Sequence, residues 1–485
     1  MKPIYFAHPN NLNRKYIFTR ANPCAPTASG LSLGKVNGGI FMKSIWHSTQ
    51  LLSPYPSLPG SIRTEAAVIG GGLAGILTAY YLTRSGIQTT ILEARRIGSG
   101  QTSGTTAKIT AQHNLIYQKL ITCFGEGDAR MYASANQQAI KEYSRLIHSH
   151  SIDCDFREAS ACLYTRLAGD SLQQEYKAAS WLGIPAKLST DTELPFSVRN
   201  ALYFPHQAQF HPLKFLKAIT KGLTIYENTP VLSVKGHQIH TSLGDVTARH
   251  IIFACHYPFL LWPGLYFARM YQSRSYCLSL AGIPSLQDMY LGIDPGGLSF
   301  RSAGNRLLLG GCSHRTGIIP DNPYQRLQNF VHKYYPTAKT VSHWSAQDCM
   351  PLDQVPYIGP FSFLEPDWYV ITGFGKWGMT TSMVAAQLIS RKICKKPVPW
   401  ESVFTPRRIK LKASWKEAIT HLSESSRGLA LGLIHPDRRC SHMGCRLKWN
   451  PHECTWECPC HGSRFSHQGK LLSGPAQTSV SIPSK

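Results

Sequence analysis

The sequence predicts three parts: an α/β domain, a region of helices and short strands set within it, and a small C-terminal domain that binds a metal ion or cluster. A glycine-rich turn between an apolar strand and a helix predicts the first part. Short strands separated by turn signals between Tyr271 and His314 predict the second part. Five of the 14 cysteines lie within residues 440–460 and predict the third part. A length of 485 residues accommodates two or three such domains.

The formal net charge of +24 at pH 7 suits two kinds of partner, a nucleic acid or an acidic protein. The Lys and Arg residues are spread along the whole chain, and no run of five or six like charges occurs. This dispersed pattern favours a generally basic surface and argues against nucleic-acid binding, which remains the alternative.

No apolar stretch reaches the ~18 residues that a membrane-spanning helix needs, and the N-terminus lacks the apolar core of a secretory signal. We therefore expect no transmembrane segment and a cytoplasmic protein. The first 41 residues contain five basic and no acidic residues and show no helical or strand period. We expect residues 1–41 to be a disordered leader or a mis-assigned start, in which case Met42 rather than Met1 begins the chain.

The α/β domain is predicted by a complete strand–turn–helix–strand unit. An apolar strand, Ala66–Ile69, runs into Gly70–Gly75, which fits the pattern G-x-G-x-x-G. Apolar residues then recur at helical spacing through Leu73–Ser85, and a second apolar strand, Thr89–Leu92, ends in Glu93. This order of elements is typical of a dinucleotide-binding fold.

Each residue type in this unit has a physical role in holding a pyrophosphate. Gly70 permits the tight turn, Gly72 lets the backbone approach the phosphates, and Gly75 allows helix and strand to pack closely. The helix N-terminus offers N–H groups and the positive end of its dipole, and Glu93 accepts hydrogen bonds from ribose hydroxyls. The predicted nucleotide contacts are Gly70, Gly72, Leu73, Ala74, Gly75 and Glu93.

Further stretches resemble the D-amino-acid-oxidase and glycine-oxidase superfamily. They are the small-residue loop 98–106, the strand residue Val231, the apolar run 251–254, the motif Pro356–Gly359 and the strand–glycine turn–helix unit 369–393. The resemblance implies a Rossmann-like domain that binds FAD, with the second glycine turn against the flavin ring. The alternative for that turn is a plain strand–helix crossover with glycines for packing. The FAD contacts that the resemblance implies are Thr102, Thr105, Thr106, Val231, Gly373, Gly375, Gly378, Met379 and Thr380.

The resemblance divides an oxidoreductase module, residues 42–400, into two interleaved parts. The FAD part is expected to comprise residues 63–115, 200–260 and 345–395. The substrate part is expected to comprise residues 116–199 and 261–344, as an inserted antiparallel α+β domain over the reactive face of the flavin. Residues 401–485 are expected to hold a linker helix and the C-terminal domain.

Two residues are candidates for a catalytic role. Superfamily members that oxidise amino acids carry an arginine a few residues before the Pro-Tyr-Ile-Gly motif, and Asp348 stands at that position here. An aspartate repels a carboxylate and attracts an amine, so we expect an amine rather than a simple amino acid as substrate. The alternative is that Asp348 caps a loop or pairs with an Arg. Lys108 is the second candidate, either near the flavin or facing solvent.

The strongest motif in the chain is C-x-H-x-x-C at Cys440–Cys445, followed by C-x-C-H-G-S at Cys458–Ser463. Two Cys and two His in paired loops suit a Rieske [2Fe–2S] centre, in which thiolates bind one iron and imidazoles bind the other. The predicted ligands are Cys440 and Cys458 for the first iron and His442 and His461 for the second. A zinc site is the alternative, because two Cys and two His are also a zinc set.

This region resembles Rieske proteins of the respiratory type, in which a disulfide ties the two ligand loops together. The resemblance implies a small all-β domain and a disulfide between Cys445 and Cys460. About 20 residues, His421–Arg439, separate a predicted helix from Cys440, so the base of this domain is expected to be shortened. Over residues 55–480, the chain is similar to bacterial FAD-dependent oxidoreductases with a C-terminal Rieske domain.

These motifs together predict an enzyme in which FAD oxidises a small organic substrate, an amine, and exchanges electrons with a [2Fe–2S] cluster. A soluble electron-transfer partner would complete the circuit, with electrons flowing in either direction. Two alternatives remain: an oxidase that uses oxygen directly and carries a structural zinc-type C-terminal module, and an FAD protein that acts on nucleic acid.

Overall fold

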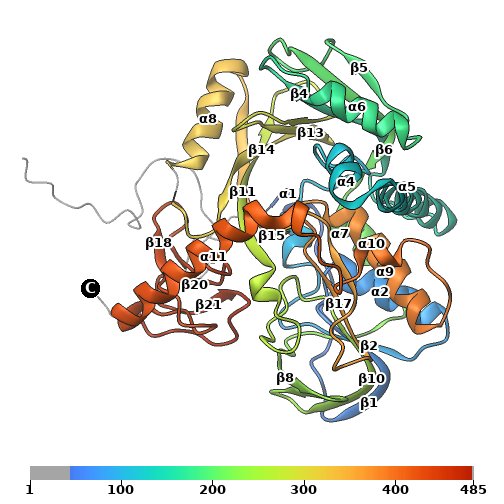
Figure 1. Ribbon diagram of the computed structural model, residues 1–485, viewed down its shortest axis with the longest axis vertical. Coiled ribbons are helices and arrows are strands. Elements are labelled where there is room, and N and C mark those ends of the chain that lie inside the picture. Colours follow the sequence, from blue (N-terminus) through green and yellow to red (C-terminus); the bar gives the residue numbers. More distant parts are fainter. Residues whose placement is uncertain (1–43, 320, 483–485) are drawn as a thin grey trace, which may run out of the picture. The chain divides into compact units, whose positions relative to one another are not determined.

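The computed structural model describes residues 44–319 and 321–482, and Figure 1 shows how their helices and strands are arranged. The predicted leader, residues 1–41, and the alternative start at Met42 lie outside the described residues. Three β-sheets organise the described part of the chain. Within it, no helix has both the length and the apolar character that crossing a bilayer requires.

Sheet A carries the dinucleotide-binding unit. Its strands are β1 (Ile62–Ile69), β2 (Thr89–Leu92), β7 (Thr224–Tyr226), β8 (Val231–Lys235), β9 (Gln238–Thr241), β10 (Asp245–Phe253), β16 (Tyr357–Pro360) and β17 (Trp368–Thr372). The main path runs β16-β17-β10-β1-β2-β7, and β8 and β9 form a hairpin beside β10. Strand β1 pairs in parallel with β2 and β10, and β10 pairs in parallel with β17. The turns after β1 and β17 therefore open at the same carboxyl edge, where α/β sheets bind ligands.

Helices α2 (Leu73–Arg84) and α9 (Gly378–Ile393) follow these two turns and pack against each other. Both are buried on most sides, because α2 also covers β1 and β2 while α9 also contacts α5 (Glu126–Ser149). The other helices of the oxidoreductase module are α1 (Ile45–Thr49), α3 (Gln101–Gly104), α4 (Tyr117–Phe124), α6 (Ser171–Trp181), α7 (Pro212–Ile219) and α8 (Pro323–Tyr334), with a 3₁₀ turn at Tyr266–Ala268.

Sheet B contains the remaining strands of the oxidoreductase module. Its strands are β3 (Lys108–Ile109), β4 (Arg157–Thr165), β5 (Lys187–Ser189), β6 (Asn200–Gln209), β11 (Met270–Ala281), β12 (Met289–Gly292), β13 (Ser299–Ala303), β14 (Arg306–Arg315) and β15 (Lys339–Pro351). Their order is β15-β11-β14-β13-β12-β4-β6-β3, with β5 beside β6. All neighbours are antiparallel except β4 and β12.

The strand pairing differs from the predicted division of residues 42–400 into an FAD part and a substrate part at three boundaries. The predicted FAD part includes β3, β6 and residues 345–351 of β15, yet all three strands pair within sheet B. The chain therefore crosses between the sheets within residues 93–107, 210–223 and 352–356. The sequence pattern misses these crossings because alternating apolar residues identify a strand but not the sheet that it joins.

The C-terminal domain follows α10 (Glu401–Phe404) and the long helix α11 (Leu411–Ile434). It is an antiparallel sheet of β18 (Lys448–Asn450), β19 (Thr455–Glu457), β20 (Arg464–Ser466) and β21 (Leu471–Ser473), preceded by a 3₁₀ turn at Pro436–Arg438. The expectation that the preceding helix ends near His421 is wrong, because α11 continues to Ile434. Only five residues then separate the helix from Cys440, which leaves little chain for a base before the first ligand loop.

A buried ion pair ties the connection after β15 to the segment between α10 and α11. The guanidinium of Arg408 donates to both carboxylate oxygens of Asp353, with N···O distances of 2.7 and 3.0 Å. It also donates to the carbonyls of Pro356 and Phe404. The buried cation thus has both an opposite charge and further hydrogen-bond acceptors.

We expect Asp353→Ala to lower the free energy of unfolding by about 3–5 kcal/mol, because it leaves the buried Arg408 charge without its partner. Urea and thermal unfolding midpoints measure the change. Glu126→Ala, which breaks the exposed pair with Arg130, is the matched control and is expected to have little effect. Equal shifts in the two variants would contradict the importance assigned to the buried pair.

Candidate functional site

A cavity of about 1040 Å³ lies between the carboxyl edge of sheet A and the strands of sheet B. It is lined by both glycine turns, by the loop 98–106 and by the start of β8. Stretches far apart in the sequence thus meet at one site. The predicted cofactor contacts that line it are Gly70, Gly72, Leu73, Ala74, Glu93, Thr102, Thr105, Thr106, Val231, Gly373, Gly375, Gly378 and Met379.

Gly70 and Gly75 of the first glycine turn have no room for a side chain. A Cβ on Gly70, whose φ is +113°, would lie 2.5 Å from the carbonyl oxygen of Ala254. A Cβ on Gly75 would lie 2.0 Å from the carbonyl oxygen of Gly70, so this glycine shapes the turn from behind rather than lining the cavity. Helix α2 begins directly at the turn, and the positive end of its dipole therefore points at the cavity.

Glu93 and Thr102 complete the nucleotide end of the cavity. The Glu93 carboxylate accepts hydrogen bonds from the backbone N–H groups of Gly71 (2.7 Å) and Arg95 (2.8 Å). Burial raises the pKa of Glu93, while these two N–H donors favour its charged form. The Thr102 hydroxyl accepts from the N–H of Leu73 at 3.0 Å, which holds the loop against the start of α2.

The second glycine turn joins β17 to α9 and lines the same cavity. Gly373 and Gly375 have φ of +74° and +55°, a region that favours glycine. One predicted contact of this turn is not part of the lining: the Thr380 hydroxyl bonds with the backbone of Thr110, donating to its carbonyl at 2.7 Å and accepting from its N–H at 3.0 Å. Thr380 therefore fastens α9 to the β3 segment, because a buried hydroxyl takes the nearest backbone partners.

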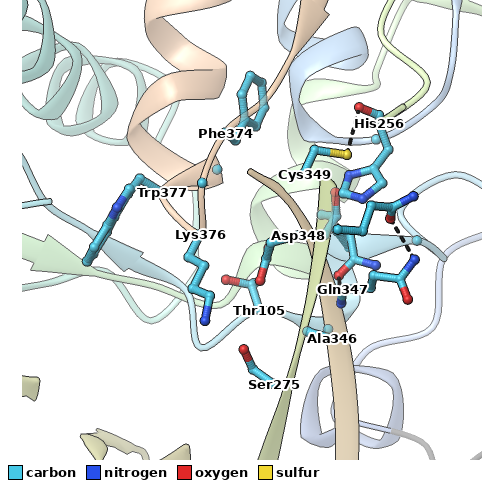
Figure 2. Close-up of a pocket in the computed structure, with 18 of the residues that line it drawn as sticks. Thr105, His256, Ser275, Ala346, Gln347, Asp348, Cys349, Phe374, Lys376 and Trp377 are labelled. Atoms are coloured by element: carbon cyan, nitrogen blue, oxygen red, sulfur yellow. Dashed lines mark hydrogen bonds between the residues drawn. The ribbon is translucent and has the colours of Figure 1, made fainter. Parts of the chain in front are cut away.

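Asp348 lies within β15 and lines the cavity, so it does not cap a loop. Figure 2 shows its carboxylate and the ammonium group of Lys376 extending toward each other, from β15 and from the second glycine turn. Burial raises the pKa of Asp348 and lowers that of Lys376, and the opposite charge of each partner counters both shifts. The charges of Lys376 and, second, of Arg274 both favour the ionised form of Asp348, and the Lys376 ammonium group donates to the hydroxyl of Ser313 at 2.6 Å. Sequence reasoning did not single out Lys376.

Lys108 also lines the cavity, and its expected solvent-facing alternative is wrong. Its ammonium group donates to the carbonyl of Tyr290 (2.7 Å) and to the hydroxyl of Ser299 (2.8 Å) on sheet B. Burial, together with the charge of Arg301, lowers the pKa of Lys108 to about 7. The side chain is therefore poised to gain or lose a proton near neutral pH.

The four predicted cluster ligands gather in the C-terminal domain. The thiols of Cys440 and Cys458 share a hydrogen bond, which lowers the pKa of Cys440 to about 7. The rings of His442 and His461 lie 5.0 Å apart, and both Nδ1 atoms are buried without a hydrogen-bond partner among the described residues. Burial lowers the pKa of His442 to about 4 and that of His461 below its usual value, so both rings are neutral. Two thiols and two unpartnered imidazole nitrogens fit a Rieske cluster.

Cys445 and Cys460 are joined as a disulfide between the two ligand loops. A second grouping of sulfurs lies here as well, since those of Cys445, Cys458 and Cys460 fall within 4.8 Å of one another. Two of these three sulfurs belong to the disulfide and cannot act as thiolates. The ligand set with Cys440, His442, Cys458 and His461 is therefore the better fit.

The second ligand loop rests on sheet B at the cavity wall. The amide of Gln272 donates to the carbonyl of His461 at 2.6 Å, and the amide of Gln347 donates to the carbonyl of Gly462 at 2.7 Å. Gln347 also donates to the side-chain oxygen of Gln272 at 2.6 Å. Both glutamines line the cavity, as does the segment 471–477 of the C-terminal domain. Sequence reasoning missed this pair because glutamines within a strand carry no motif.

A buried charge cluster holds the two domains together beside these glutamines. Arg274 of β11 pairs with Glu453 at 2.5 Å and lies 3.6 Å from Glu457, while Arg464 lies 3.4 and 3.5 Å from the same two carboxylates. Burial opposes the charge on Glu453, yet the two arginines hold its pKa at about 2. Arg274 comes from sheet B and its partners from the C-terminal domain, so the pairing spans the boundary.

Residues 65–392 match the family described as FAD dependent oxidoreductase (DAO), and residues 434–484 match the Rieske [2Fe-2S] domain family. The chain is 36% identical over 488 residues to YhfW of Bacillus subtilis (strain 168), a protein named for a Rieske 2Fe-2S centre, covering 90% of this chain and 96% of YhfW. It is 23% identical to gamma-glutamylputrescine oxidoreductase of Escherichia coli (strain K12), covering 71% of this chain and 86% of that protein.

Solved structures share the fold of the oxidoreductase module. Glycine oxidase from Geobacillus kaustophilus aligns with a TM-score of 0.62 at 20% identity, covering 72% of this chain and 99% of its own. L-proline dehydrogenase from P. horikoshii aligns with a TM-score of 0.60 at 17% identity, covering 72% of this chain and 98% of its own. These likenesses and the two family matches confirm the predicted fold class, and the family matches confirm the predicted cofactors, FAD and a [2Fe–2S] cluster.

We expect Gly75→Ala to weaken FAD binding about tenfold or more, because relieving the clash with the Gly70 carbonyl costs about 1–3 kcal/mol. The ratio of flavin to protein absorbance after purification measures the loss. Gly127→Ala is the control, since a Cβ at that position in α5 meets open space. Full FAD content in the Gly75 variant would show that the close packing behind the turn is dispensable.

We expect the stability difference between the wild type and Lys108→Met to depend on pH. The unfolded state binds a proton at Lys108 up to its usual pKa of 10.5, whereas the folded state loses it above about 7. The wild type therefore gains stability relative to the variant as pH rises from 7 toward 10.5, by at most about 1.4 kcal/mol per pH unit. Urea midpoints at both ends of this window measure it; Lys141→Met, at an exposed site, is the control. A difference that is constant with pH would contradict the lowered pKa.

Proposed function

Because this chain belongs to the DAO family of FAD-dependent oxidoreductases and carries a Rieske domain, we propose that it oxidises a small amine and exchanges the electrons between its two cofactors. FAD, when bound, supplies two-electron oxidation of a C–N bond, and the [2Fe–2S] cluster supplies one-electron exchange. A separate redox partner completes the circuit. The residues of this chain bind the substrate, hold the two sites at a fixed separation and shield them from water.

The contact between the cluster loop and the cavity wall carries the proposal. His461, a predicted ligand, and Gly462 are hydrogen-bonded through their carbonyls to Gln272 and Gln347, and both glutamines line the cavity. The charge cluster around Arg274 and Glu453 fastens the same two surfaces. A cluster bound by this loop would lie at the wall of the cavity, which supports direct electron exchange within one molecule.

Asp348 and Lys376 support an amine substrate, and one that also carries a negative group. The carboxylate of Asp348 attracts a protonated amine, and the ammonium group of Lys376 attracts an anion on the same molecule. With Lys376 nearby, Asp348 no longer disfavours a substrate that carries a carboxylate in addition to its amine. A zwitterionic amine can meet both of these charges with groups of opposite sign.

Anaerobic mixing of the holoenzyme with a panel of simple amines and zwitterionic amines tests this function. A substrate is expected to bleach the visible flavin band and to produce the EPR signal of a reduced Rieske cluster in the same sample. Bleaching without that signal, in protein that holds iron, would refute the exchange between the cofactors. Zinc in place of iron would instead favour the oxygen-using alternative with a structural C-terminal module.

Gln347→Ala tests the contact itself. Losing its hydrogen bonds to Gly462 and Gln272 destabilises the docked loop by about 1–3 kcal/mol, enough to raise the undocked population about tenfold. We expect slower reduction of the cluster at an unchanged rate of flavin bleaching, measured by rapid freezing and EPR. The dithionite-reduced EPR signal reports that the cluster is retained. Gln138→Ala, at an exposed position of α5, is the matched control, and equal rates in the two variants would contradict the proposed path.

A further inference from the structure

Helix α11 (Leu411–Ile434), the long orange-to-red helix of Figure 1, packs by its small residues against the cluster loops. A Cβ on Gly428 would lie 2.5 Å from the Sγ of Cys460, and a Cβ on Gly432 would lie 2.0 Å from the carbonyl oxygen of Gly444. Only glycine allows this approach, so the rotation of α11 about its own axis is fixed. Its opposite face must then point away from the protein.

That outward face is apolar. Its residues recur at spacings of four, four, three and eleven positions, which places them on one side of a helix. They are between 53% and 75% exposed, although large apolar side chains at helical spacing normally pack into a core. We call this set the α11 stripe: Leu411, Trp415, Ile419, Leu422 and Leu433.

The charges beside the stripe have one sign. The acidic residues of α11, Glu417 and Glu424, are only partly exposed and interact with Arg315 of sheet B. The Lys416 ammonium lies 5.5 Å from the centre of the Trp415 ring, at the border of the stripe. The exposed charged side chains of α11 are all basic, and the Lys412 ammonium group also donates to the carbonyl of Thr122 at 3.0 Å. These side chains are Lys412, Lys416 and Arg427.

Exposed apolar side chains beside basic ones also occur before the N-terminal end of the helix. Ile409 is 80% exposed, and the exposed Phe363 carries the guanidinium of Arg407 over its ring at 4.4 Å. An apolar band with an aromatic side chain and a basic border is the composition of helices that lie in the surface of an anionic bilayer.

We propose that the α11 stripe docks the protein onto an anionic lipid surface, an interaction that goes beyond the proposed redox function. The apolar side chains enter the boundary of the acyl chains, and Lys412, Lys416 and Arg427 meet the phosphate headgroups. A second copy of the chain is the less suitable occupant, because pairing two stripes brings their basic borders together in a protein of net charge +24. An uncharged bilayer leaves the basic border unmatched.

Vesicle flotation of the full-length holoprotein tests the proposal. We expect binding to vesicles of equal parts phosphatidylglycerol and phosphatidylcholine, weak binding to phosphatidylcholine alone, and loss of binding at about 0.5 M salt. We expect two variants to bind the anionic vesicles at least about tenfold more weakly than the wild type. One is the triple variant Trp415→Ser, Ile419→Ser, Leu422→Ser, and the other is the double variant Lys412→Glu, Lys416→Glu. Unchanged flavin and cluster absorbance shows that each variant is folded.

Matched controls separate the stripe from general stickiness and charge. Trp181→Ser removes an exposed tryptophan on α6, and Lys187→Glu with Lys235→Glu reverses two exposed lysines of the oxidoreductase module; both proteins are expected to bind like the wild type. Equal loss in the controls, or equal binding to both kinds of vesicle, would overturn the proposal. So would a wild-type dimer that the triple variant converts to a monomer, since the stripe would then cover a second copy.

Discussion

The pairing of Arg274 with Glu453 and Glu457 is the interaction on which the arrangement of the two cofactor sites depends. Charges removed from water are tolerated only when opposite charges meet them. Within the C-terminal domain, Arg464 supplies one positive charge for two buried carboxylates, and the second comes from Arg274 on sheet B. The C-terminal domain is therefore electrostatically complete only where it contacts the oxidoreductase module, and the hydrogen bonds of the two glutamines become available at that same place.

The cavity combines fixed dipoles at one edge with titratable charges at the other. Helices α2 and α9 both begin at glycine turns that line it, so two positive helix ends point into the cavity. Across from them, sheet B contributes Asp348 and Lys108, and Lys376 reaches in from the second turn. Because these groups are held by strands and tight turns, their positions need little rearrangement when a ligand binds.

The sequence predicts those parts of the structure that are encoded locally. The glycine turn with α2, the second turn with α9 and the cluster ligands each occupy a short stretch whose residue types have one physical use. Strand β6 is different, because its partner β4 lies about 40 residues away and the apolar pattern fits either sheet. No motif marks Lys376, Gln272 or Gln347, and only the structure shows that they lie near Asp348 and His461. Thr380 is not among the residues that line the cavity, because its hydroxyl is hydrogen-bonded to the backbone of Thr110. The ligand assignments and the catalytic roles of Asp348 and Lys108 stay predictions.

The glycines on the inner face of α11 determine how close the helix lies to the cluster loops. With Gly428 and Gly432 against the loops that carry Cys460 and Gly444, the backbone of the helix lies as close to the cluster loops as two main chains allow. Whatever covers the outer face is then separated from these loops by the width of the helix, about 10 Å. A molecule resting on that face, in a bilayer or in another protein, would thus lie about one helix diameter from the loops that surround the cluster site.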